Sequence, residues 1–192
     1  EYEIKIEGDE TMLSKKMEEA LNGQINKEMY SAYLYMAMSA QATDMGLDGF
    51  AKWFMIQYHE EMFHAMKIYE FVFDRNGRVE LGQIDKPPVE FDSIKEMFEK
   101  TLEHEQFVTK SINELVELAI SEHDHATNNF LQWYVAEQVE EEKNDHEILT
   151  KLDFLTDVKK GNGILMLDRE MGARTLTAPS DFSVSGFAEE ED

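Results

Sequence analysis

Residues 57–66, QYHEEMFHAM, contain two residue types that bind metal ions, Glu61 and His64. Side chains three residues apart project from the same face of a helix. The apolar residues around them follow the same spacing of three and four: Phe50, Phe54, Ile68 and Phe71. A buried charge without a partner is strongly destabilising, so we expect this pair to be ion-paired, neutralised or bound to a metal ion. On the core side of a helical bundle, such a pair is typical of a metal site.

The composition limits the fold and the partners. Of 192 residues 42% are hydrophobic and only three are proline, which with long amphipathic runs predicts one all-α domain. The net charge of −23 argues against nucleic acid or an anionic membrane surface as a partner. No cysteine is present, which excludes disulfides, thiol catalysis and cysteine-ligated iron. No apolar run approaches the roughly 20 residues of a membrane helix and no signal peptide is visible, so we expect a cytoplasmic protein.

The pattern of apolar residues and helix breakers divides the chain into elements. The expected divisions are an N-terminal arm at 1–10, one domain at 11–173 and an acidic C-terminal tail at 174–192. The spacing predicts long helices at about 11–41, 48–76, 93–122 and 128–157, and a short one at about 163–172. Thr11 and Asp48 are the expected N-caps of the first two helices. Pro87-Pro88 and two glycines exclude a helix from 77–92, which we expect to cross between two helical hairpins.

Each long helix carries polar residues on its apolar stripe. They are Glu28, Glu61 with His64, Glu105, and Gln138 with Glu141. Glu28 lies about 13 residues before the end of its helix and Glu61 about 13 after the start of the next, which places them level in an antiparallel hairpin. A single glutamate is more often on a solvated face, but a set in register on four stripes indicates one cluster. Its carboxylates would repel one another without cations, and oxygen ligands with one nitrogen suit iron.

Three motifs resemble the non-haem ferritins of bacteria and archaea. They are LNGQINKEMYSAYLYMAMS at 21–39, YHEEMFHAMK at 58–67 and NFLQWYVAEQVEEE at 129–142. The resemblance extends over about 12–171, nearly the whole chain. It implies a ferritin-like four-helix bundle with a long crossover between helices 2 and 3 and a short fifth C-terminal helix.

The resemblance also implies the roles of individual residues. The first iron would bind Glu28, Glu61 and His64, and Glu61 would bridge to a second iron on Glu105 and Glu141. Gln138 would lie beside the second iron and steer oxygen or water. The residues that match a third iron site are Glu60, Glu137 and Glu140. Tyr35 matches a tyrosine that family members use as an electron donor, with Trp133 close by.

The activity that the resemblance implies is iron storage and detoxification. The chain would be a ferroxidase that oxidises Fe(II) to Fe(III) with dioxygen or peroxide, two iron ions per centre. Family members form hollow shells of 24 subunits that hold ferric oxyhydroxide, with the fifth helix at the fourfold axes. The expected partners are further copies of the chain, not nucleic acid or a membrane.

Related proteins give the alternatives. Bacterioferritin and rubrerythrin carry a second Glu-x-x-His on the last long helix, where this chain has Gln138-x-x-Glu141. A DNA-binding mini-ferritin lacks the fifth helix and does not suit the charge. A passive storage subunit would have lost ligands of the centre. A di-iron oxidase or a peroxidase of the rubrerythrin type stays an alternative.

Other candidate ligands lie outside this set. The remaining histidines, expected at the surface or near hairpins, are His59, His104, His123, His125 and His146. Methionines in the long helices are more often core filler than haem ligands, so no haem is expected.

Overall fold

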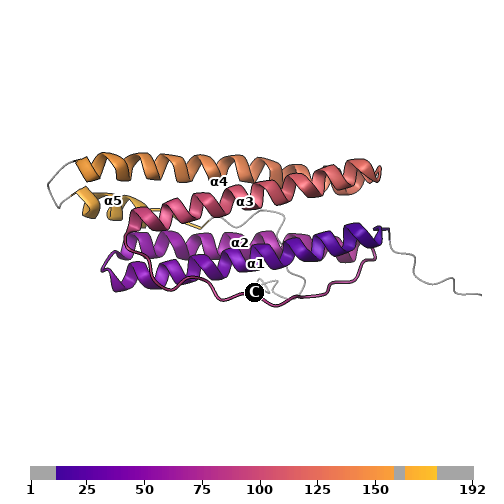
Figure 1. Cartoon of the computed structure of the whole chain (residues 1–192), viewed down its shortest axis with the longest axis horizontal. Helices are drawn as coiled ribbons and strands as arrows, with labels where there is room; N and C mark the ends of the chain where they lie inside the picture. Colours follow the sequence, from indigo (N-terminus) through magenta and orange to yellow (C-terminus); the bar gives the residue numbers. More distant parts are fainter. Residues whose placement is uncertain (1–11, 158–162, 177–192) are drawn as a thin grey trace, which may run out of the picture.

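The structure is a computed structural model that describes residues 12–157 and 163–176. These residues contain no strand and five helices: α1 (Lys15–Asp44), α2 (Asp48–Asp74), α3 (Ile94–Ser121), α4 (His125–Asp157) and α5 (Gly163–Gly172). Figure 1 shows α1 and α2 side by side as one hairpin and α3 and α4 as another. The predicted all-α bundle is therefore confirmed. None of the helices described is long and apolar enough to cross a lipid bilayer.

The helix boundaries differ from the predicted ones because the caps differ. α1 begins at Lys15 rather than residue 11, since the Oγ atom of Ser14 accepts a hydrogen bond of 3.0 Å from the amide of Met17. The predicted cap Thr11 lies outside the described residues. Asp48 is the first residue of α2 and not its cap, because Leu47 occupies the N-cap position without a side-chain bond.

The second hairpin turn is also shorter than predicted. α4 begins at His125, three residues before the expected start at 128. Asp124 accepts hydrogen bonds from the amide and the hydroxyl of Thr127, at 3.1 and 2.6 Å, and so satisfies the free donors of the first turn. His123 completes the turn with a φ of 58°, a conformation that a periodicity argument does not reveal.

The segment between α2 and α3 is the predicted long crossover. It runs along the outside of α1 (Figure 1), where two asparagines fix it. The side chain of Asn22 bonds the carbonyl of Arg78 at 2.9 Å and the amide of Glu80 at 2.8 Å, and Asn26 bonds the carbonyl of Gln83 at 3.0 Å. These bonds satisfy backbone groups that have no helix to pair them.

The interior consists of two apolar clusters with a polar layer between them. One cluster contains Leu21 and Ile25 of α1, and the other contains Leu34 and Met38 of the same helix. The same division recurs in the other long helices, and the predicted polar residues fall in the interval each time. The bundle therefore places all the candidate ligands at one level.

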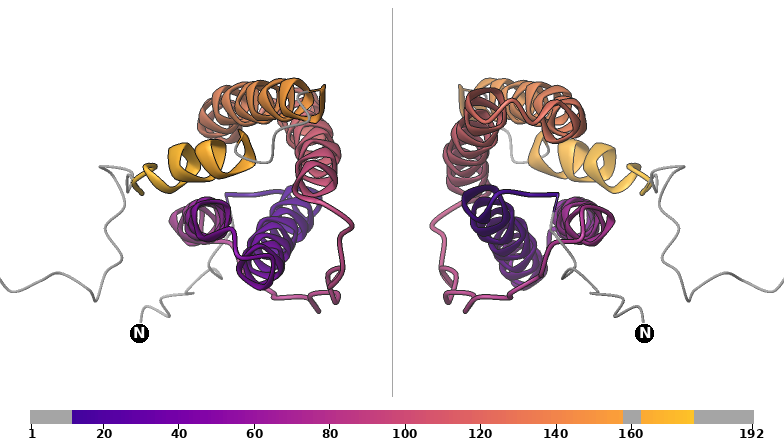
Figure 2. Two further views of the ribbon diagram at one scale, coloured as in Figure 1. Left: turned by 90° about the vertical axis from the view of Figure 1, so that its left-hand side faces the viewer. Right: turned by 90° about the vertical axis from the view of Figure 1, so that its right-hand side faces the viewer.

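α5 lies on one side of the bundle, against α2 and α4 (Figure 2). Leu167 and Met171 are buried in this contact. Asp168 accepts a hydrogen bond of 3.0 Å from the amide of Phe50 at the start of α2. The two helices approach so closely because Gly49 has no side chain: a Cβ atom there would lie 1.7 Å from the carbonyl oxygen of Asp168.

Candidate metal centre

The first half of the site comes from α1 and α2. Glu28, Glu61 and His64 each offer one ligand atom within 4.8 Å of the others, and all three side chains are buried. Nδ1 of His64 lies 3.4 Å from Oε2 of Glu61. The structure thus brings together the residues that sequence spacing placed on facing helix stripes. Two carboxylates and one imidazole are a suitable donor set for a divalent iron ion.

The second half comes from α3 and α4. Glu105, Gln138 and Glu141 are buried, and Nε2 of Gln138 donates to Oε2 of Glu105 at 2.9 Å. Tyr35 on α1 donates its hydroxyl to the other oxygen of Glu105. Burial, reinforced by the charge of Glu105, raises the pKa of Tyr35 well above its usual range, so the phenol keeps its proton. Glu61 interacts electrostatically with Glu105 and Glu141 as well as with Glu28, so the buried carboxylates of the two halves lie in one polar layer.

The electrostatics of this layer favour cations. Burial is the main cause that raises the pKa of Glu61 well above its usual range, and the charges of Glu105, Glu28 and Glu141 add to it. Burial likewise raises the pKa of Glu105, and it raises that of Glu141 to about 7. Carboxylates that are desolvated and close together are stabilised either by protons or by metal ions. Oε2 of Glu28 is buried without a hydrogen-bond partner among the described residues, which suits an acceptor reserved for a cation.

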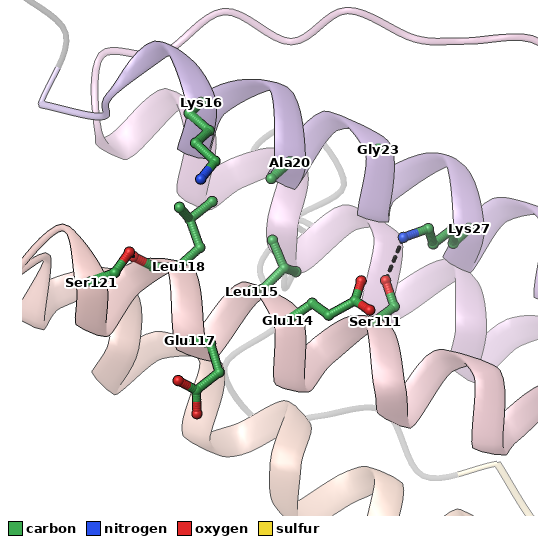
Figure 3. A pocket seen from close by; sticks show the side chains of 10 residues that line it. All are labelled: Lys16, Ala20, Gly23, Lys27, Ser111, Glu114, Leu115, Glu117, Leu118 and Ser121. Carbon is green, nitrogen blue, oxygen red and sulfur yellow. Dashed lines mark hydrogen bonds between the residues drawn. The ribbon is translucent and has the colours of Figure 1, made fainter.

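A chain of hydrogen bonds holds the other oxygen of Glu28. Gln24 donates to Oε1 of Glu28 at 2.8 Å, and the hydroxyl of Ser111 donates to Oε1 of Gln24 at 2.6 Å. Ser111 in turn accepts from Lys27, at a surface groove of about 580 Å³ between α1 and α3 (Figure 3). The groove is not itself the metal centre. Ser111, which lines the groove, instead helps to orient the ligand Glu28 through Gln24.

The histidine ligand is also supported by its neighbours. Tyr134 donates its hydroxyl to the backbone carbonyl of His64 at 2.7 Å. The ring of Trp133 meets the imidazole edge-on, with ring centres 5.4 Å apart. These contacts from α4 fix the position of His64 and its part of α2 relative to α4.

The predicted third site is less well assembled than the centre. Glu60 and Glu137 are half-buried and Glu140 is exposed. Burial raises the pKa of Glu60, and the charge of Arg174 opposes that shift. The pKa of Glu137 is raised mainly by burial, with a smaller contribution from Glu140. The three do not form a compact ligand cluster in the described part of the chain, so the third site stays a prediction.

Sequence reasoning missed a further buried carboxylate, Asp145 on α4. It is 1% exposed, and its Oδ2 atom has no hydrogen-bond partner among the described residues. Burial, with the charges of Glu105 and Glu141, raises its pKa to about 9. The signal was present in the sequence, because Gln138, Glu141 and Asp145 follow the helical spacing of three and four.

The predicted surface position is wrong for His104. It is half-buried, with Nε2 2.7 Å from the hydroxyl of Ser31, and its ring lies near those of Tyr30 and Tyr35. Burial lowers its pKa to about 4. It is therefore a neutral structural residue.

Comparisons with known proteins agree with this geometry. Residues 18–155 match the family described as the ferritin-like domain. A bacterial non-heme ferritin of Campylobacter jejuni is 44% identical over 158 residues, which cover 82% of this chain and 93% of that protein. Another from Staphylococcus aureus is 41% identical over 166 residues, 86% of this chain and 98% of that protein.

A solved structure gives the same result. An open-pore ferritin from the hyperthermophilic archaeon Archaeoglobus fulgidus superposes with a TM-score of 0.83 at 50% identity, covering 85% of this chain and 99% of that one. The match includes the bundle and the short C-terminal helix. The chain therefore belongs to the ferritin family, as a non-haem ferritin of the bacterial and archaeal type.

Proposed function

We propose that this protein stores iron and oxidises it, converting Fe(II) to Fe(III) at the buried layer between the four long helices. The observation that carries the proposal is the cluster of Glu28, Glu61 and His64, with ligand atoms within 4.8 Å of one another. Glu105 and Glu141 face it from α3 and α4. Membership of the non-haem ferritins supports iron storage as the overall task.

The donor set suits oxidation at paired iron ions. Two Fe(II) ions give one electron each, and dioxygen takes up both electrons and two protons to form hydrogen peroxide. Anionic oxygen ligands favour Fe(III) over Fe(II). Glu61 interacts electrostatically with carboxylates of both halves, which suits a bridging ligand. Tyr35 and Gln138 both donate hydrogen bonds to Glu105, which supports a role for Gln138 beside the second iron and for Tyr35 as a reserve electron donor when only one Fe(II) is bound.

Storage requires an enclosed space, so we propose that the chain assembles into a hollow shell of 24 copies in the cytoplasm. Glu60, Glu137 and Glu140 would then form a third iron site next to the centre. Exposed apolar side chains on α5 and the crossover support self-association, since they include Leu165, Met166 and Leu81. No haem or nucleic acid enters this function.

Stopped-flow measurement of Fe(II) oxidation in air, at two Fe(II) per chain, tests the proposal. We expect a rapid phase in the parent and an initial rate at least about tenfold lower in Glu61→Ala and His64→Ala, because each loses a ligand. Matched controls are Glu117→Ala and His146→Ala, which change exposed residues of the same types on α3 and α4.

The outcomes separate the candidate functions. A parental rate in either ligand variant would contradict the site assignment. A parent no faster than iron in buffer, both in air and with hydrogen peroxide, would make the chain a passive storage subunit. The same experiment without air, started with hydrogen peroxide, distinguishes a peroxide-dependent oxidase, which would react rapidly only there.

A further inference from the structure

Arg174 lies two residues beyond α5, and its guanidinium returns to the bundle to contact three residues of α2. Nη2 lies 2.7 Å from Oε2 of Glu60, and Nη1 donates a hydrogen bond to Oε1 of Gln57. Cζ lies 5.1 Å from the ring centre of Trp53. A charge-assisted hydrogen bond and stacking on an indole both favour a guanidinium. Arg174 is thus a cation that the chain itself supplies to this part of α2.

Gln57 connects this cation to the metal centre. It is fully buried, and its Nε2 atom donates to Oε2 of Glu141 at 3.0 Å. Only one orientation of the amide satisfies both neighbours, because Arg174 offers donors alone and Glu141 accepts. The arginine therefore keeps the amide nitrogen of Gln57 directed at a carboxylate of the second half-site.

Arg174 and a metal ion would compete for the carboxylate of Glu60. The oxygen that bonds Arg174 is one of the two through which Glu60 could bind a cation. Both side chains of the pair are mostly shielded, with 26% of Arg174 and 19% of Glu60 exposed, so solvent screens the attraction only in part. Arginine keeps its charge at any physiological pH. The guanidinium can therefore release Glu60 only by moving away.

We propose that Arg174 is a positioning residue that occupies Glu60 in the iron-free protein and directs Gln57 toward Glu141, so that iron binds at Glu60 only after the guanidinium has moved. This inference rests on the proposed function, because it takes Glu60 as part of a third iron site. It makes the third site the last to fill and connects its filling to the orientation of Glu141.

Calorimetric titration of the iron-free, full-length protein with Zn(II), which is not oxidised, tests the competition. We expect Arg174→Ala to bind zinc about tenfold more tightly at its weakest site, or to gain a site that the parent lacks, because a charge-assisted bond no longer competes. The gain should vanish in a Glu60→Gln background. The matched control is Lys151→Gln, which removes a 2.5 Å ion pair from α4 to Glu170 of α5 but does not touch α2.

Identical titrations of the parent and Arg174→Ala, or a gain that persists with Glu60→Gln, would overturn the proposal. Failure of the proposed function gives a different result: His64→Ala would then bind zinc as the parent does. Arg174→Lys covers the case in which the alanine variant does not fold. Lysine keeps the charge but cannot bond Gln57 and Glu60 in parallel, so we expect a smaller gain. If the alanine variant does not fold, a parental zinc affinity in Arg174→Lys would overturn the proposal.

Trp53 reports the movement directly. Because the chain has two tryptophans, a Trp133→Phe background leaves Trp53 as the single emitter. We expect its emission to change as the weakest zinc site fills, and to stay constant in Arg174→Ala, where no guanidinium covers the ring. Constant emission up to saturation in the arginine-containing protein would contradict the movement.

Discussion

At the scale of single residues, burial of the carboxylates has two effects: it favours the binding of cations, and it lowers the stability of the fold when they are charged and no cation is bound. Glu61, Glu105 and Glu141 have raised pKa values chiefly because they are desolvated. A metal ion offsets that desolvation, whereas the iron-free protein must keep protons on some of these groups. Metal binding and stability are therefore linked.

Asp145 isolates this effect because it is not one of the expected ligands. Its pKa is about 9 in the folded protein, far above the ordinary 3.8, so folding favours its protonated form. That contribution to stability is full below about pH 4 and is lost as pH rises to about 9, by at most about 1.4 kcal/mol per pH unit. We expect Asp145→Asn, which does not titrate, to gain stability relative to the parent over this range. Thermal unfolding with a chelator at several pH values measures the difference.

Asp85→Asn is the control for this prediction, because Asp85 is an exposed aspartate of the crossover. Its unfolding temperature should follow that of the parent at every pH. Parallel profiles for the parent and Asp145→Asn would show that Asp145 does not hold a proton in the folded protein.

At the scale of elements, the attachment of α5 depends on one close approach to α2. Alanine at Gly49 would place a Cβ atom 1.7 Å from the carbonyl oxygen of Asp168, so α5 must move. We expect Gly49→Ala to release α5 and to break the bond from the Phe50 amide to Asp168, while the four long helices stay folded. Hydrogen exchange of the α5 amides should then accelerate about tenfold or more, since local opening costs less free energy.

Gly23→Ala provides the opposite case on α1, because a Cβ atom there has no neighbour within 4 Å. Alanine in an exposed helix interior should stabilise α1 by up to about 1 kcal/mol and leave α5 exchange unchanged. Parental α5 exchange in Gly49→Ala would mean that the helix contact tolerates a side chain.

The elements also show how far the sequence alone could go. Helical spacing predicted the helices to within a few residues, because each long helix buries a stripe that is apolar except at the polar layer. Caps were less predictable, since Thr11 was the expected cap of α1, whereas the hydrogen bond from the Met17 amide identifies Ser14. The close approach at Gly49 depends on how α2 and α5 pack, and the local pattern of residues does not reveal that packing.

The same distinction applies to the site. The sequence could predict the burial of Glu28, Glu61, His64, Glu105 and Glu141, because each lies on an otherwise apolar stripe. Arg174 was not, because its partner Glu60 is 114 residues away and the contact depends on the path of the chain after α5. Asp145 had a readable spacing, but a single acidic residue in so acidic a chain is more often solvated.

At the scale of the whole molecule, a net charge of −23 opposes association of copies, so assembly needs apolar contacts and screening by salt. α5 offers such contacts, because it buries Leu167 against the bundle and leaves Leu165 and Met166 51% and 71% exposed. These residues are the ones we expect neighbouring copies to cover.

Met166→Glu should therefore stop assembly at smaller oligomers, most clearly at low salt, where an added negative charge is least screened. Met166→Leu keeps the apolar surface and should assemble like the parent. Sedimentation velocity in about 50 mM and 500 mM salt compares the three proteins, since repulsion reaches farther at the lower concentration. Circular dichroism should show equal helix content, because the side chain lies outside the subunit core. If all three sediment as one species at both concentrations, this face of α5 is not a subunit contact, and the proposed shell would need other surfaces such as the crossover.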